Sequence, residues 1–121
     1  MNYDYDNIFA KILRGEIPCN KIYEDEFVLS FYDINPQKKI HALVIPKGKY
    51  IDLDDFNTNA SDKEIIGLMK GITTVSKKLG ISSIDGKGYR ALANISDYGG
   101  QEVPHLHFHL FGGEKIGKMV S

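Results

Sequence analysis

Residues 104–111 read PHLHFHLF, so that His105, His107 and His109 alternate with leucine and phenylalanine. Side chains along a β-strand point alternately to its two faces, so we expect the three histidines on one face and the apolar side chains in the core. Neighbouring histidines would then lie ~6.6 Å apart along the strand. The chain has four histidines, and the fourth, His41, lies far upstream. This concentration favours a functional site over a merely polar outer face.

The bulk composition indicates one ordinary globular domain. The 121 residues give room for a single core, and 42% hydrophobic with 26% charged residues argues against disorder. A net charge of −1 provides no basic field for a nucleic acid polymer, so an anionic ligand would have to be held by local groups. The single cysteine, Cys19, excludes an intramolecular disulfide and a cysteine-rich metal site.

Targeting signals are not evident in the sequence. The first residues, MNYDYDNIFAKIL, lack a basic segment followed by an apolar run, so we expect no signal peptide. No stretch approaches the roughly 20 apolar residues that span a bilayer. We therefore expect a cytoplasmic protein that does not contact membranes.

Two amphipathic segments predict helices. In NIFAKILRGEIP (residues 7–18), the apolar residues between Ile8 and Leu13 share a face. In SDKEIIGLMKGITTVSKKLG (residues 61–80), Ser61 and Glu64 match a capping box, and Gly80 suits the end of the helix. The apolar positions of this second helix are Ile65, Leu68, Met69, Ile72, Val75 and Leu79.

The remaining segments predict strands and turns. KIYED and FVLSFYDI read as a hairpin, followed by a turn (INPQKK), and HALVIP, GYRALANI and PHLHFHLF read as three further strands. The pattern predicts an α+β domain, with an antiparallel sheet of about five strands and two helices. Two helices would leave a face or an edge of the sheet uncovered, so we expect a homodimer.

Two chemistries suit the histidine strand. Histidines two residues apart can share a zinc ion with a third ligand from elsewhere, but the outer pair would lie ~13 Å apart, too far to share one ion. Alternatively, one imidazole attacks phosphorus while its neighbours fix its tautomer or donate to phosphate oxygens. We favour the second chemistry.

The pattern His-φ-His-φ-His-φ-φ, with φ apolar, resembles the signature of the histidine triad (HIT) family. Five segments in order are similar to its Hint branch: NIFAKILRGEIP, FYDINPQ, HALVIPK, GYRALANISDYGGQEV and PHLHFHLFGG. The resemblance implies a single HIT domain over residues 1–121, a HIT-like fold, a homodimer, and no cofactor or metal. It also implies hydrolysis of the P–N bond of purine nucleoside 5'-phosphoramidates, such as AMP derivatives, through a covalent nucleotidyl-histidine intermediate.

The resemblance assigns roles to all four histidines. His107 would attack the α-phosphorus. The main-chain carbonyl of His105 would hold the ring of His107, and His109 would donate to phosphate. His41 matches a family histidine that is hydrogen-bonded within the cluster.

The resemblance also implies a substrate pocket. Asp33 and Ile34 match ribose contacts, and Asn94 matches a residue near the scissile phosphate. Gly99, Gly100 and Gln101 form a permissive loop beside the triad, whose successive N–H groups could form an anion nest, although these residues alone are more typical of a plain turn. The other positions implied to bind substrate are Phe9, Ile12, Ile17 and Phe31 at the purine, and Gln101, Glu102 and Val103 beside the triad.

The sequence departs from the family pattern in two respects. Asn7 and Ala10 stand where some bacterial relatives have cysteines of a structural zinc site, so we expect no zinc. Glu102 stands where many animal members have a serine that contacts phosphate. An ionised carboxylate cannot donate a hydrogen bond, so only the backbone N–H of Glu102 could serve.

Two other functions remain open from the sequence. One is hydrolysis of dinucleoside polyphosphates, an activity of another branch of the same family. The other is a nucleotide-binding or interaction module with little activity. Zinc binding is a weaker alternative. The sequence leaves the amine leaving group, the choice between adenine and guanine, the role of the tail GEKIGKMVS and any protein partner undetermined.

Overall fold

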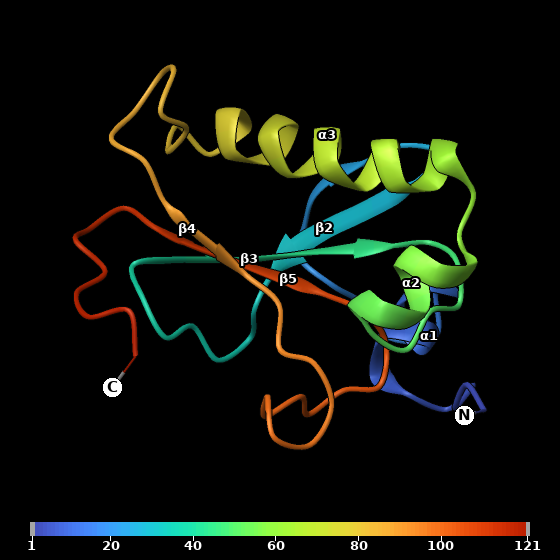
Figure 1. The fold of residues 1–121 in the computed structure, drawn as a ribbon. Coiled ribbons are helices and arrows are strands. Elements are labelled where there is room, and N and C mark those ends of the chain that lie inside the picture. Colours follow the sequence, from blue (N-terminus) through green and yellow to red (C-terminus); the bar gives the residue numbers. More distant parts are fainter. Residues whose placement is uncertain (1, 121) are drawn as a thin grey trace.

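The structure, a computed structural model, describes residues 2–120 and contains a five-stranded antiparallel sheet with three helices (Figure 1). The strand order is β1-β2-β3-β5-β4. The strands are β1 (Lys21–Glu24), β2 (Val28–Tyr32), β3 (Ile40–Pro46), β4 (Arg90–Leu92) and β5 (Phe108–Gly112). The helices are α1 (Ile8–Leu13), α2 (Leu53–Asn59) and α3 (Asp62–Lys78). The α+β class and the antiparallel sheet are therefore confirmed, whereas the prediction of two helices is wrong.

The additional helix, α2, has little periodic signal in the sequence. Its seven residues, LDDFNTN, contain one fully buried side chain, Phe56. Asp52 caps the helix by accepting a hydrogen bond from the backbone N–H of Asp55 at 2.8 Å. A helix held by one cap and one buried aromatic ring is too short for hydrophobic periodicity to reveal it.

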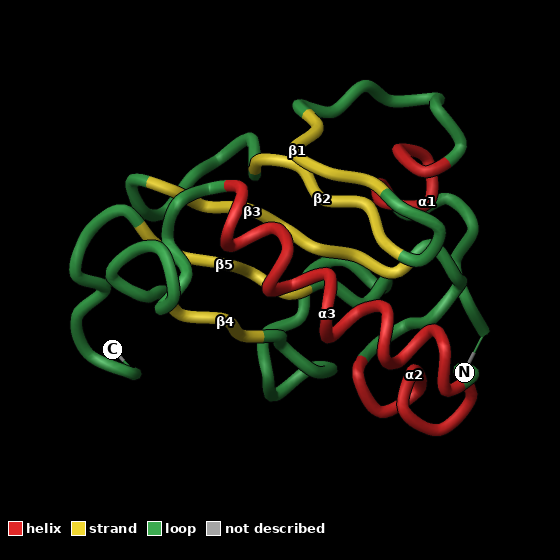
Figure 2. The backbone as a smooth tube through the Cα atoms, turned by 90° about the horizontal axis from the view of Figure 1, so that it is seen from above, coloured by secondary structure: helices red, strands yellow, loops and turns green. Residues whose placement is uncertain are grey.

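The long helix α3 follows its prediction closely. Ser61 and Glu64 form the reciprocal capping box, and Leu68 and Val75 are buried against the sheet. Seen from above, α3 lies across the sheet (Figure 2). Gly71 permits this approach, because a Cβ atom there would lie only 3.0 Å from a methyl carbon of Val28. Met69, which shares the apolar spacing, is instead 47% exposed.

The histidine segment is only partly a strand. Because β5 begins at Phe108, His105 and His107 precede it, and the predicted strand over residues 104–111 is wrong at its start. Pro104 has no N–H to donate to a neighbouring strand. The backbone N–H of Leu106 donates to the carbonyl of Tyr50 at 2.8 Å, which lies outside the sheet. The chain is therefore held by loop contacts until β5 joins β3.

The two faces of the sheet have different partners. On the face covered by α2 and α3, Val28, Val44 and Leu110 belong to one core cluster. On the opposite face, Leu29 and Leu43 pack with side chains of α1. The register pairs Leu43 of β3 with His109 of β5, and His41 with Phe111, which places both histidines on the α1 face. No helix within residues 2–120 is long and apolar enough to cross a membrane.

The homodimer remains a prediction. On α3, Ile66 is 53% and Met69 is 47% exposed, and β4 occupies one edge of the sheet. Exposed apolar side chains and a short edge strand are surfaces that a second copy can cover. We expect sedimentation velocity at micromolar concentration to give twice the mass of the chain. A single species with the mass of one chain would contradict this prediction.

Candidate active site

A cavity of about 600 Å³ opens on the α1 face of the sheet, where β3, β4 and β5 lie side by side. We call it the histidine hollow. A larger cavity of about 860 Å³, lined by the 80–81, 86–90 and 113–116 segments, contains no histidine. The residues predicted from sequence that line the histidine hollow are Phe9, Asp33, His41, Asn94, Glu102, Val103, His107 and His109.

Some predicted pocket residues lie elsewhere. Ile12 and Ile17 line a separate hollow of about 470 Å³ beside β1 and β2. Phe31 is buried behind Phe9, with their rings packed edge-to-face at 5.7 Å. Ile34 is 84% exposed beside Asp33 and does not line the hollow. The structure therefore brings Phe9 to the histidines and leaves the other predicted purine contacts outside the hollow.

His107 is held in one tautomer by its own backbone neighbour. Its Nδ1 lies 2.7 Å from the main-chain carbonyl oxygen of His105. A carbonyl only accepts, so Nδ1 has the hydrogen and Nε2 keeps a free lone pair. Burial lowers the pKa of His107, which favours the neutral ring. Phe9 packs edge-to-face on this ring at 4.9 Å and fixes its plane. The result is a neutral imidazole with one nitrogen available for attack.

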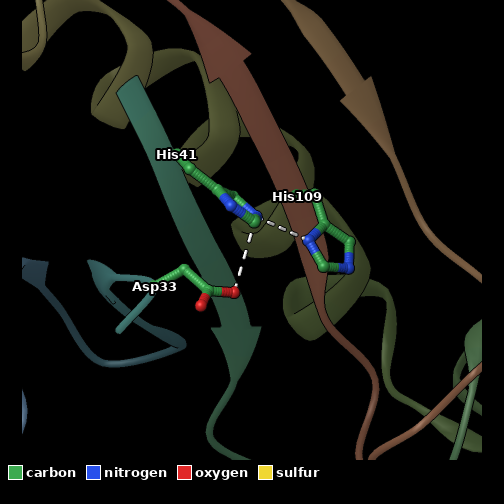
Figure 3. Close-up of side chains that lie close together, drawn as sticks. All are labelled: Asp33, His41 and His109. Atoms are coloured by element: carbon green, nitrogen blue, oxygen red, sulfur yellow. Dashed lines mark hydrogen bonds and ion pairs between the residues drawn. The ribbon is translucent and has the colours of Figure 1, made fainter. Parts of the chain in front are cut away.

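His41 and His109 belong to a chain of hydrogen bonds that defines the tautomer of both rings. The backbone N–H of Gln37 donates to Nδ1 of His41 at 3.1 Å, so the hydrogen of His41 is on Nε2. That Nε2 lies 2.9 Å from Nδ1 of His109 (Figure 3). Nδ1 of His109 therefore accepts, and His109 has its own hydrogen on Nε2. Figure 3 shows this Nε2 on the side of the ring away from His41, where it can donate to a ligand.

Asp33 completes this chain from the end of β2. Its Oδ2 lies 3.5 Å from Nε2 of His41 (Figure 3). Burial lowers the pKa of His41 and outweighs the opposing effect of the Asp33 carboxylate. At neutral pH the contact is thus between a carboxylate and a neutral N–H, not an ion pair. Phe111, which sequence reasoning missed, packs on His41 at 4.4 Å and stacks on His109 at 5.7 Å.

His105 lies beneath the hollow and is fully buried. Its Nε2 is 2.9 Å from the carbonyl oxygen of Pro46, and its Nδ1 is 2.6 Å from the hydroxyl of Tyr3. Burial lowers the pKa of His105 to about 4. Burial, together with the nearby His107 and His41, also lowers the pKa of His109 to about 4. All four rings are consequently neutral near pH 7.

Two N–H groups of the loop after β4 are used in turn hydrogen bonds and so do not contribute to an anion nest. The N–H of Gly100 donates to the carbonyl of Asp97, and the N–H of Gln101 donates to the carbonyl of Ser96. The Gln101 side chain braces the loop, because its Nε2 donates to the carbonyls of Ile51 at 2.7 Å and Val103 at 3.0 Å. Gln101 is therefore placed to support the rim of the hollow, while Glu102 and Val103 line it.

The hollow has an unusual balance of charge for an anion site. Two carboxylates, Asp33 and Glu102, line it, and none of its described lining residues is a lysine or arginine. The negative charge of a phosphate bound there would be stabilised by neutral N–H donors, such as the His109 ring and the Asn94 amide. Such donors suit a singly charged phosphate group better than a chain of several phosphates.

One group of side chains in residues 2–120 could hold a metal ion. Ligand atoms of Asp33, His41 and His109 all lie within 4.8 Å of one another. The hydrogen between His41 and His109 would first have to leave, because a metal ligand needs a free lone pair on each nitrogen. The expectation of no bound metal stays a prediction.

Comparisons with known proteins find relatives that match this chain over most of its length. A HIT domain family model matches residues 14–116. An uncharacterised HIT-like protein of Azospirillum brasilense is 50% identical, and the match covers 98% of this chain and 95% of that protein. A purine nucleoside phosphoramidase of Escherichia coli K12 is 39% identical over 96% of this chain and 94% of its own length.

Solved structures of related proteins are also similar to this chain. A histidine triad protein from Clostridium difficile is 40% identical, with a TM-score of 0.81 and coverage of 98% of both chains. A HIT family hydrolase from Clostridium thermocellum is 36% identical, with a TM-score of 0.84, covering 96% of this chain and 97% of that one. These identities over whole chains show a shared fold and family.

The lowered histidine pKa values predict a pH dependence of folding stability. The unfolded chain takes up protons on these rings near pH 6.5, whereas folded His105 and His109 do so at about 4. The contribution of these rings to the free energy of unfolding is therefore fully present above about pH 6.5. It is lost as the pH drops toward 4, by about 3 kcal/mol for His105. Histidine Cε1–H NMR shifts should titrate near pH 4 for both rings. Midpoints near 6.5 would contradict the buried, neutral assignment.

Proposed function

The chain belongs to the HIT domain family, and we propose that it is a metal-free hydrolase that cleaves the P–N bond of purine nucleoside 5'-phosphoramidates. The observation that supports this most directly is the 2.7 Å hydrogen bond between Nδ1 of His107 and the carbonyl of His105. It leaves Nε2 of His107 unprotonated in a ring that lines the hollow. The Escherichia coli relative named a purine nucleoside phosphoramidase supports the choice of substrate.

In the first step, Nε2 of His107 attacks the α-phosphorus and the bond from phosphorus to the amine breaks. The leaving nitrogen takes a proton from solvent as the bond breaks, so the amine departs neutral, while His109 stays neutral and its Nε2–H donates a hydrogen bond to a phosphate oxygen. His107 now has a phosphorus on Nε2 and a hydrogen on Nδ1, so it is cationic. The carbonyl dipole of His105 stabilises that charge through the existing hydrogen bond.

In the second step, water attacks the phosphorus of the nucleotidyl-histidine. Its proton returns to solvent, and the bond from phosphorus to Nε2 of His107 breaks, so that His107 leaves as a neutral imidazole. The products are the nucleoside monophosphate and the amine, and His107 returns to its starting tautomer. His41 supports both steps, because its Nε2–H donates to Nδ1 of His109 and keeps the hydrogen of His109 on Nε2, where it can donate to the phosphate.

Substrate contacts are assigned by chemistry and position in the hollow. Asp33 accepts from the ribose hydroxyls, Phe9 and Val103 contact the nucleoside, and Asn94 donates to a phosphate oxygen. The backbone N–H of Glu102 makes no hydrogen bond with a described residue and is a further donor. With two carboxylates and no lysine or arginine among the described lining residues, the hollow disfavours dinucleoside polyphosphates, which carry several negative charges.

Steady-state assays test the proposed activity. We expect adenosine 5'-phosphoramidate to be hydrolysed faster than a dinucleoside tetraphosphate, at a rate that EDTA does not change. A preference for the tetraphosphate would favour the other hydrolase activity of the family. Binding of AMP without turnover of either substrate would favour a binding module, and loss of activity in EDTA together with bound zinc would overturn the metal-free mechanism.

Replacement of His107 should remove the nucleophile. We expect His107→Ala to lower kcat by roughly three orders of magnitude or more, about 4 kcal/mol of barrier, because no other ring replaces the attacking nitrogen. His109→Ala is the matched control, since it removes an imidazole from the same hollow but leaves the nucleophile in place, and it should retain more activity. Near-normal turnover of a folded His107→Ala protein would refute this assignment.

Replacement of Asp33 should act mainly on binding. Ribose contacts lie away from phosphorus and act about equally in the ground state and transition state, so Asp33→Ala should raise KM and leave kcat nearly unchanged. Asp33→Asn, which keeps the size of the side chain, separates loss of charge from loss of contact. A collapse of kcat at constant KM would show that Asp33 acts through His41 instead.

A further inference from the structure

The segment that precedes α1 reaches the histidine cluster through Tyr3. The hydroxyl of Tyr3 lies 2.6 Å from Nδ1 of His105, and their rings meet edge-to-face at 5.7 Å. The other nitrogen of His105, Nε2, faces the carbonyl of Pro46, which only accepts. Because Nε2 then has the hydrogen of the neutral ring, Nδ1 is an acceptor and Tyr3 is the donor. These two bonds fix both the tautomer and the orientation of a fully buried ring.

His105 also determines where His107 points. Its main-chain carbonyl accepts the Nδ1–H of His107 at 2.7 Å. The segment lies before β5, so the sheet does not hold this carbonyl. Its position depends on the N–H of Leu106, which donates to Tyr50, and on the anchored ring of His105. A change in that ring therefore alters the backbone that orients the nucleophile.

Tyr3 is itself held in place. The ring of Tyr5 packs edge-to-face on it at 5.3 Å. Arg14 donates from Nη1 to the carbonyl of Tyr5 at 2.7 Å, and Asn7 donates from Nδ2 to the carbonyl of Asp4 at 2.7 Å. These contacts tie the segment to the start and the end of α1, so the hydroxyl of Tyr3 is presented to His105 in a defined geometry.

We propose that Tyr3 is a positioning residue for the reaction, acting through His105 on the orientation of the His107 ring. This role rests on the proposed function of the same site. Tyr3 is not among the residues that line the hollow, so its hydroxyl lies outside the proposed substrate site. It keeps Nδ1 of His105 satisfied, and thereby keeps the carbonyl of His105 in line with Nδ1–H of His107.

Tyr3→Phe tests this proposal, because it removes the hydroxyl and keeps the ring. We expect kcat to fall about tenfold, as is usual when a supporting hydrogen bond behind a reactive group is lost. KM should stay within about twofold, since no substrate contact is removed. Tyr5→Phe is the matched control: its hydroxyl makes no hydrogen bond with residues 2–120, so activity should stay at the wild-type level.

NMR of the histidine rings provides a readout that loss of stability alone would not change. In the wild type, Nδ1–H of His107 should give a slowly exchanging low-field proton signal, and Nδ1 of His105 a ¹⁵N shift typical of a hydrogen-bonded acceptor. Tyr3→Phe should move the His105 shift toward that of a free acceptor and shift or broaden the His107 signal. Tyr5→Phe should leave both unchanged.

The outcomes separate this proposal from the proposed function. Unchanged kcat in Tyr3→Phe, an equal loss in Tyr5→Phe, or an unmoved His107 signal would each overturn the role of Tyr3. If wild-type protein does not hydrolyse the phosphoramidate, the proposed function fails. The His107 signal then decides alone whether Tyr3 orients that ring.

Discussion

The main-chain carbonyl of His105 accepts a hydrogen bond from the His107 ring, and the proposed reactivity of the hollow depends on this bond. It determines which nitrogen of His107 is free, and in the proposed mechanism it stabilises the cation that forms when that nitrogen attacks. The carbonyl belongs to a segment outside the sheet, so its position depends on contacts from distant parts of the chain. Pro46 at the end of β3 and Tyr3 in front of α1 both bind the His105 ring. Packing around the buried ring of His105 thus determines the orientation of the His107 ring.

The second constraint is electrostatic. Four imidazoles held neutral by burial, beside Asp33 and Glu102, form a site that provides hydrogen-bond donors without a fixed positive charge in its described lining. Neutral rings donate and accept hydrogen bonds without adding charge to the site, and the hydrogen bonds from Gln37 to His41 and from His41 to His109 determine which nitrogen of each ring has the hydrogen. The lack of a fixed positive charge in the described lining limits how much negative charge a ligand can have. A nucleoside phosphoramidate, with one phosphate group, matches this limit.

Much of the fold and of the histidine site could be predicted from the sequence. The capping box and apolar spacing of α3 are local signals, and the alternation in β3 and β5 places His41 and His109 on one face. Phe111 follows the same alternation and could have been found two residues beyond His109. By contrast, α2 depends on the burial of Phe56, and the irregular backbone at His105 depends on Tyr50 and Pro46, which no local pattern connects to it. Tyr3 reaches His105 across more than 100 residues of sequence and gives no local signal at all. The N–H groups of Gly100 and Gln101 could have joined an anion nest, but they donate to carbonyls within the loop.

The central claim is that Nε2 of His107 becomes covalently bonded to phosphorus, and its most direct test is to trap that species. Wild-type protein is mixed with excess adenosine 5'-phosphoramidate, quenched in alkali within a single turnover, digested and mapped by mass spectrometry. Alkali is used because a bond between histidine and phosphorus is labile in acid. We expect an adenylyl group on the peptide containing the triad, localised to His107 by fragmentation. An adduct on another residue, or none while hydrolysis proceeds, would contradict it.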